Sequence, residues 1–263
     1  MNLLAPKEFL GLTEAECVRV QEELSPALEP WDRTPPGDIR SVAGVDLAYW
    51  QEGGRELAVC CIVVLDAWTG AVLEEAHCAG EVRFPYIPGC FAFRELPLVL
   101  ETASRLTEKP GLYLFDGNGV LHPRGLGLAS HASFYLNTPT AGIAKSFYQV
   151  AGAVCPMPED RAGAWADITK DGQILGRVLR THAGVKPVYL SVGNWVSLDT
   201  VTELALRLTG KESRVPLPTR LADLATHEQR GHLKGTLEKQ KKSDIMENNA
   251  KKGQAPCKKG AVL

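Results

Sequence analysis

The spacing of apolar residues predicts one helix and then three consecutive β-strands in the first third of the chain. The helix begins after Thr13, because Thr13-Glu-Ala-Glu16 has the capping-box pattern, and it continues to about Leu24. Three apolar segments follow, separated by glycine-bearing turns: IRSVAGVDLAYW, LAVCCIVVLDA and TGAVLEEAHCAGEV (residues 39–50, 57–67 and 69–82). We expect these strands to pair antiparallel, and the first to end near Asp46.

The rest of the chain alternates between helical and strand patterns. We expect a helix over 91–109, in which Pro97 is tolerable only near the first turn, and another that is capped by Ser197 and ended by Gly210. The other expected elements are a strand at 111–115, a helix over 125–137, and strands within 139–147 and 186–193. This order predicts an α/β fold. Its mixed sheet has three antiparallel strands first and then strands alternating with helices, and helices flank it in one domain.

Composition and charge divide the chain into a globular body and a basic tail. The 263 residues are 44% hydrophobic and 23% charged, which is typical of a globular protein. From Lys234 onward eight lysines accompany three acidic residues, so this part carries +5, whereas the remainder carries −7. We therefore expect a domain over 1–232 and a disordered tail over 233–263. The tail is interpreted either as a solubilising appendage or as an arm that attracts a polyanion.

Cysteine usage favours a reducing compartment. The seven cysteines form no CxxC pair, which argues against a disulfide framework and against a zinc knuckle. The N-terminus lacks the pattern of a signal peptide, and the longest apolar run, Leu57 to Leu65, is too short to span a bilayer. We expect a cytoplasmic monomer that does not associate with membranes.

Three acidic residues accompany apolar elements. Asp46 lies in the strand VAGVDLAYW, Glu95 opens a helix in FRELP, and Asp116 ends the strand GLYLF. Any one of them alone is most simply a helix cap or half of an ion pair, because a buried carboxylate is costly unless it is paired or binds a metal. Three that can pack side by side favour a Mg²⁺ or Mn²⁺ site. Enzymes that hydrolyse phosphodiesters commonly use such a site, in which the metal activates water and stabilises the leaving oxygen.

The motifs around these acids carry a family resemblance. VAGVDLAY, FPYIPGCFAFRELP, DGNGVLHPRGLGLASH, PTAGIAKS and LPTRLADL occur in this order between about Glu14 and Glu228. The set resembles the endonuclease V family, ribonuclease H-like nucleases that nick nucleic acid near deaminated adenine (inosine). The resemblance implies a Mg²⁺-dependent endonuclease, with Mn²⁺ as a substitute, that cuts DNA or RNA containing inosine on the 3′ side, in DNA repair or in processing of inosine-containing RNA.

The resemblance also assigns roles to individual residues. Asp46 and Asp116 fall on the metal-binding aspartates, and Glu95 on the active-site glutamate, which we also expect to bind metal. Lys145 in AGIAKS falls on a lysine near the cleaved phosphate, where an ammonium group neutralises developing charge. Tyr86, held by Pro85, falls on the aromatic wedge that fills the space of a displaced base. The alternatives are a turn residue at position 86 and a solvated lysine at position 145.

The loop after Asp116 supplies further candidates for substrate binding. Gly117 and Gly119 allow backbone amides to approach an anion or a flipped base, although a plain glycine turn would look the same. His122 and Arg124 are expected to contact phosphate or to support the acids. Taken alone, each of these two is as well explained as a surface residue.

Two positions depart from the family pattern. LSVGNWVSL has Asn194 where the family commonly has a histidine that assists the metal centre. Because asparagine is a weaker ligand and cannot transfer protons, the alternative function is a protein that binds inosine-containing nucleic acid with weak or no cleavage. Asn137 stands where an acidic residue is expected before Pro-Thr. The sequence does not decide between DNA and RNA.

Overall fold

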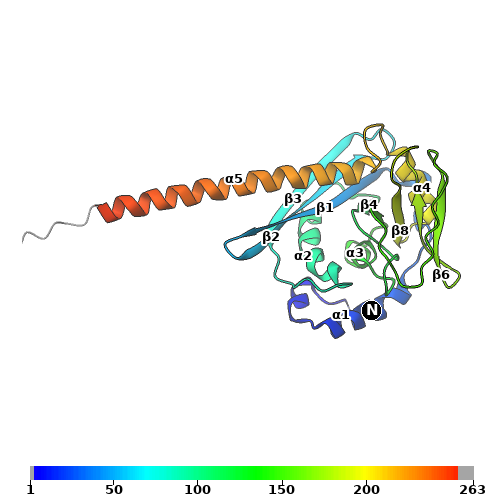
Figure 1. Ribbon diagram of the computed structural model, residues 1–263, viewed down its shortest axis with the longest axis horizontal. Helices are drawn as coiled ribbons and strands as arrows, with labels where there is room; N and C mark the ends of the chain where they lie inside the picture. Colours follow the sequence, from blue (N-terminus) through cyan, green and yellow to red (C-terminus); the bar gives the residue numbers. More distant parts are fainter. Residues whose placement is uncertain (1–2, 254–263) are drawn as a thin grey trace, which may run out of the picture.

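The computed structural model describes residues 3–253 as one mixed sheet with helices on both faces (Figure 1). The strands are β1 (Ser41–Glu52), β2 (Arg55–Asp66), β3 (Val72–Glu81), β4 (Leu112–Phe115), β5 (Thr140–Ala144), β6 (Trp165–Lys170), β7 (Gln173–Leu179) and β8 (Val188–Asn194). The α-helices are α1 (Glu14–Leu24), α2 (Phe91–Ala103), α3 (Leu128–Leu136), α4 (Leu198–Arg207) and α5 (Leu217–Gly253). No helix in this part of the chain is long and apolar enough to cross a membrane.

The eight strands lie in the order β3-β2-β1-β4-β5-β8-β7-β6. The first three pair antiparallel, as the sequence predicts, and β1, β4 and β5 run parallel. The hairpin of β6 and β7 was not predicted, because β6 buries only Ile168 fully and so lacks an apolar repeat. Its signal is the turn Asp171-Gly172, in which both residues have positive φ, as a two-residue hairpin turn requires.

Side-chain alternation along β1 divides the core into two layers. Ala43 and Val45 pack with α2 and α3 on one face, whereas Ala48 and Trp50 pack under α5 on the other. The start of α5 approaches β1 closely at Gly44, where a Cβ atom would lie 1.9 Å from the carbonyl oxygen of Pro218. Because any larger residue would push the helix away, this contact sets how near α5 comes to the middle of the sheet.

The ends of three predicted elements differ from expectation. β1 continues past Asp46 to Glu52, because it pairs with β2 along its whole length. Pro97 is the seventh residue of α2 rather than part of its first turn, and Glu95 is the fifth rather than the first. Pro97 is exposed, so water can satisfy the carbonyl that loses its partner. α4 ends at Arg207, before Gly210.

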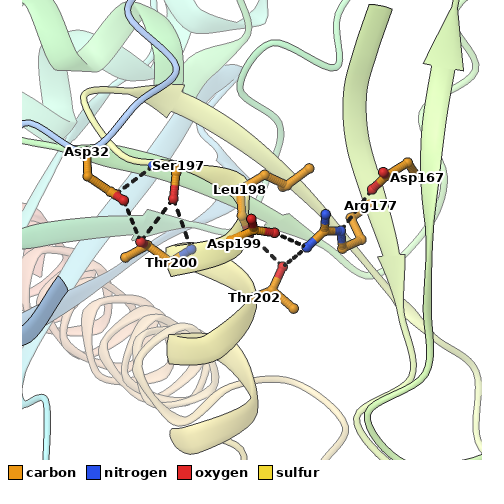
Figure 2. Close-up of polar contacts among 8 residues, drawn as sticks. All are labelled: Asp32, Asp167, Arg177, Ser197, Leu198, Asp199, Thr200 and Thr202. Atoms are coloured by element: carbon orange, nitrogen blue, oxygen red, sulfur yellow. Dashed lines mark hydrogen bonds and ion pairs between the residues drawn. The ribbon is translucent and has the colours of Figure 1, made fainter.

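The expected N-cap of α4 is confirmed, and Figure 2 shows how it is anchored. Ser197 Oγ accepts a hydrogen bond from the backbone amide of Thr200 at 3.1 Å, and Asp32 accepts hydrogen bonds from the Ser197 amide and the Thr200 hydroxyl, each at 2.8 Å. On the far side of the helix, Arg177 of β7 donates at 2.8–3.1 Å to Asp167, Asp199 and Thr202. The β6–β7 hairpin is thereby fixed to α4.

The sequence predicts a disordered tail from residue 233, whereas in the structure residues 233–253 continue α5 as helix away from the body (Figure 1). The sequence after Pro218 has no further proline before residue 253 and is rich in Lys, Glu, Gln, Ala and Leu, which are good helix formers. Leu221, Ala222, Ala225 and Leu233 anchor the first part of α5 on the sheet. Residues 254–263 of the predicted tail lie outside the described residues.

Candidate active site

The end of the pairing between β1 and β4 places two carboxylates side by side. The two parallel strands pair from Val42↔Leu112 to Val45↔Phe115, and the next residues are Asp46 and Asp116. The backbone amide of Asp116 still donates to the carbonyl of Val45 at 3.0 Å, which holds the two chains together at this point. Both side chains therefore project on the same face of the sheet.

A third acid, Asp223 of α5, completes the group. Oxygen atoms of Asp46, Asp116 and Asp223 lie within 4.8 Å of one another, an arrangement that could hold a metal ion. Asp223 belongs to the motif LPTRLADL, and the family resemblance of this motif predicts no role for it. The available signal was an acid among Leu221, Ala222 and Leu224, on a helix whose apolar residues must face the sheet.

Lys145, directly after β5, is the cation that faces this group. Its Nζ lies 2.7 Å from Asp116 Oδ2 and 3.4 Å from Asp223 Oδ1. Burial alone would lower the pKa of Lys145, but the hydrogen bond and charge of Asp116, with the charge of Asp223, outweigh burial and raise it. The ammonium group therefore stays charged and offsets part of the repulsion between the carboxylates.

Lys145 does not neutralise all three carboxylates, and the charge that remains affects the pKa of Asp46. Burial, and next the charge of Asp116, raise the pKa of Asp46 to about 6, although a hydrogen bond of 2.9 Å from the Thr226 hydroxyl opposes the shift. Three carboxylates with one ammonium group thus hold more negative charge than they can stabilise alone. Hard oxygen ligands with excess charge fit a divalent cation.

Glu95 approaches from the other face of the sheet. It is buried on α2, and its Oε1 accepts a hydrogen bond of 2.6 Å from the hydroxyl of Tyr49. Burial raises the pKa of Glu95 to about 8, and the charges of Asp46 and Asp116 contribute to the shift. Glu95 is therefore near Asp46 and Asp116, but it is not part of the group within 4.8 Å.

A cavity of about 380 Å³ opens beside Asp116. Tyr86, on the PYIPG loop, lines its rim with 69% of its surface exposed and with its ring edge-on to Phe91. The cavity is lined by Gln21, Tyr86, Ile87, Pro88, Gly89, Phe91, Ala92, Asp116, Gly117, Asn118, His122, Leu126, Gly127, Leu128 and Tyr148. Aromatic rings and backbone edges of this kind suit a flat heterocycle. Pro85 is exposed beside Tyr86 and does not line the cavity.

His122 and Arg124 hold two loops together. His122 Nε2 lies 3.0 Å from the carbonyl oxygen of Gly89, and Arg124 donates to the same oxygen at 2.7 Å and to Gln21 Oε1 at 2.6 Å. Burial, and next the charge of Arg124, lower the pKa of His122 to about 4. A neutral, buried imidazole is poorly suited to bind phosphate. The partners of both residues are Gly89 and Gln21, so these contacts support the loops around the cavity, and the expected support of the acids or contact with phosphate stays a prediction.

The two glycines of the DGNG loop differ in their surroundings. Gly117 lines the cavity, where its backbone is accessible to a ligand. Gly119 is buried, its amide donates to Ser191 Oγ at 2.7 Å, and a Cβ atom there would lie 1.9 Å from the carbonyl oxygen of Val192. Close packing against β8 thus accounts for Gly119, and its amide is not free to approach a ligand.

Asn194 lies at the wrong end of the sheet to be a metal ligand, which corrects the sequence-based hypothesis. It pairs with Thr140, at the start of β5, whereas Lys145 follows the end of that strand, roughly 17 Å away at strand spacing. Its buried amide accepts from the Glu29 amide at 2.8 Å and donates to Ser133 Oγ at 3.0 Å. The other departure, Asn137, adopts a left-handed conformation (φ 46°) at the end of α3, which asparagine tolerates well.

Residues 22–224 match the family model of Endonuclease V. The chain belongs to the endonuclease V family. Endonuclease V of Bacillus thuringiensis is 46% identical over 218 residues, which cover 83% of this chain and 93% of that protein. The crystal structure of endonuclease V from Bacillus subtilis is 42% identical, with a TM-score of 0.84 over 90% of this chain and 100% of the other.

A more distant endonuclease V, from Ciona intestinalis, was crystallised in complex with a 24mer DNA containing an inosine followed by a ribo-adenosine. It is 26% identical, with a TM-score of 0.74 over 83% of this chain and 98% of that one. These similarities confirm the expected ribonuclease H-like α/β fold. Membership of the endonuclease V family also implies a divalent metal, and the three aspartates are the residues that fit one.

The raised pKa of Asp46 predicts how the metal-free protein responds to pH. Folded Asp46 keeps its proton up to about pH 6, whereas the unfolded chain releases it near 3.8, so stability falls as pH rises between these values. Asp46→Asn should flatten this part of the curve, by up to roughly 3 kcal/mol in unfolding free energy. Denaturant unfolding in EDTA between pH 4 and 7 measures the difference.

Asp38→Asn, at an exposed position in a short 3-10 turn, is the matched control and should leave the slope unchanged. Saturating Mg²⁺ should stabilise wild-type protein more at pH 7 than at pH 5, because metal binding releases the proton. Identical pH profiles for wild type and Asp46→Asn would contradict the assigned environment of Asp46.

Proposed function

We propose that this protein is a Mg²⁺-dependent endonuclease that recognises inosine in DNA, RNA or both and hydrolyses a nearby phosphodiester on its 3′ side. The observation that carries the proposal is the group Asp46, Asp116 and Asp223 beside a cavity of about 380 Å³ with Tyr86 at its rim. A family relative bound to inosine-containing DNA supports the choice of base. The biological setting is DNA repair or processing of inosine-containing RNA.

The residues divide the work between recognition and hydrolysis. A Mg²⁺ ion held by Asp46, Asp116 and Asp223, with Mn²⁺ as substitute, would activate water and stabilise the leaving oxygen. Lys145 forms an ion pair with Asp116, and its ammonium group would pair with a phosphate oxygen instead when substrate binds. The cavity receives the displaced base, and Tyr86 stacks in the space that the base leaves.

The hypothesis of a binding protein with feeble cleavage loses its basis. It depended on Asn194 as a weakened metal ligand, and the amide of Asn194 is engaged by Glu29 and Ser133 instead. We place the enzyme in a reducing compartment, the cytoplasm, as a monomer. The six cysteines among the described residues are free thiols, and five of them are buried, which accords with this setting.

Incubation with Mg²⁺ and four labelled oligonucleotides, DNA and RNA with and without one inosine, tests the function directly. We expect a single cut on the 3′ side of inosine in at least one of the two inosine substrates. Asp116→Ala should abolish the cut while inosine binding in Ca²⁺ survives, because it removes a metal ligand and leaves Tyr86 and the rest of the cavity wall in place. Equal cleavage with and without inosine would refute the proposal, and so would no cleavage by wild type.

Tyr86→Ala tests base displacement. The ring is exposed and makes one edge-on contact with Phe91, so its loss should not disturb folding. Discrimination between inosine and normal sites is measured as the ratio of their kcat/KM values. This ratio should fall by the factor that corresponds to the free energy of one stacking contact, ~1–3 kcal/mol. Trp68→Ala, at another exposed aromatic residue that lies on the β2–β3 turn, is the control. An equal loss on both substrates would exclude a wedge.

The basic end of the chain is tested by truncation after Gly235, which keeps the anchored part of α5. If the lysines beyond it attract nucleic acid, binding should weaken at low salt, and the salt dependence should flatten by about one to three phosphate contacts. The rate at saturating substrate should not change, since the acid group stays intact. Fluorescence anisotropy across a salt series compares the two proteins. If affinity depends on salt in the same way in the full-length and truncated proteins, the segment after Gly235 is a solubilising appendage.

A further inference from the structure

Strand β1 contributes to both faces of the candidate site. Asp46 and Tyr49 are three residues apart on this strand, so their side chains point to opposite faces of the sheet. Asp46 faces α5, where it accepts a hydrogen bond from Thr226. Tyr49 faces α2, where its hydroxyl donates to Glu95. The pairing of β1 with β4 ends at Val45, so β4 does not flank β1 between Asp46 and Tyr49.

The hydroxyl of Tyr49 donates a hydrogen bond to the buried carboxylate of Glu95. Glu95 is 5% exposed, and the bond from Tyr49 Oη to Oε1 is short, at 2.6 Å. A hydrogen bond to the charged form favours that form, which a buried acid near Asp46 and Asp116 otherwise resists. One donor therefore fixes the orientation of the carboxylate.

The ring of Tyr49 is itself held in place. The guanidinium of Arg94 lies 5.1 Å from the centroid of this ring and forms an ion pair with Glu56. Arg94 also donates to the carbonyl oxygen of Phe84 at 2.8 Å, directly before Pro85 and Tyr86. A tyrosine that only needed a buried partner would not require a charged clamp on its ring. Arg94 therefore packs against the ring of Tyr49 in the orientation from which its hydroxyl reaches Glu95.

We propose that Tyr49 is a positioning residue, whose hydroxyl orients the Glu95 carboxylate toward the group of Asp46, Asp116 and Asp223. The proposal rests on the proposed function, because it assigns this group to a divalent cation. Residues that hydrogen-bond to the groups around a metal commonly change its affinity or the activity by about 10–100-fold. Tyr49 acts through Glu95 and does not contact the reacting atoms.

Tyr49→Phe removes the hydroxyl and keeps the ring beneath Arg94. Tyr135→Phe is a matched control, because Tyr135 is also half-buried and donates one hydrogen bond, of 2.9 Å, to a carbonyl oxygen (Leu4) away from the acids. Two quantities are measured for both variants and wild type. The first is the increase in melting temperature with added Mg²⁺ relative to EDTA, which needs no substrate. The second is the Mg²⁺ concentration for half-maximal cleavage of an inosine oligonucleotide.

We expect both variants to lose similar stability in EDTA, and only Tyr49→Phe to require about 10-fold more Mg²⁺ in both measurements. Equal Mg²⁺ requirements in the two variants would overturn the proposal and leave Tyr49 as a core residue. A wild type that is stabilised by Mg²⁺ but does not cut inosine substrates would refute the proposed function alone, because the melting experiment would still decide the role of Tyr49. If Tyr49→Phe does not melt cooperatively, Arg94→Lys is measured in its place. This substitution weakens the contact with the ring of Tyr49 and should also raise the Mg²⁺ requirement. An unchanged requirement in Arg94→Lys would overturn the proposal.

Discussion

The mutual repulsion of Asp46, Asp116 and Asp223 is the constraint on which the rest of the molecule depends. Two of these acids come together because parallel strands β1 and β4 stop pairing at Val45 and Phe115, so both chains present their next side chain at the same level. The third arrives because Gly44 lets Pro218 approach the strand. Backbone geometry thus brings together charges that would separate if they were free, and the well-packed sheet beneath them makes this possible.

The surroundings of the acids relieve this repulsion only in part. Lys145 offers one positive charge and Thr226 one hydroxyl, yet the pKa of Asp46 stays near 6 and that of buried Glu95 near 8. A fully compensated network would be more stable but would have no affinity left for a cation. The incomplete compensation is therefore what a metal-binding site requires, and the free energy that it costs in the metal-free protein is regained when a divalent ion binds.

The sequence predicts those parts of the site that are local, and the structure is needed for those that are not. Asp46 and Asp116 could be found because each accompanies an apolar strand, and the helix from Glu14 and the cap at Ser197 because their signals lie within a few residues. Asp223 was missed because a helix from a distant part of the chain brings it in. Asn194 was misplaced because the antiparallel register of β5 and β8, which puts it far from Lys145, is not written in the motif.

The acid group and the cavity share a single stretch of backbone. Asp116 belongs to the acid group and also lines the cavity, and Gly117 follows it directly along the cavity wall. On the opposite wall, the loop with Tyr86 is tied by Gly89 to Arg124 and His122, which come from the same segment as Asp116. The cavity therefore lies between two loops that these hydrogen bonds join. These contacts set the position of the cavity relative to the acids. They also account for Arg124 beside the cavity, because its guanidinium group is already hydrogen-bonded to Gly89 and Gln21.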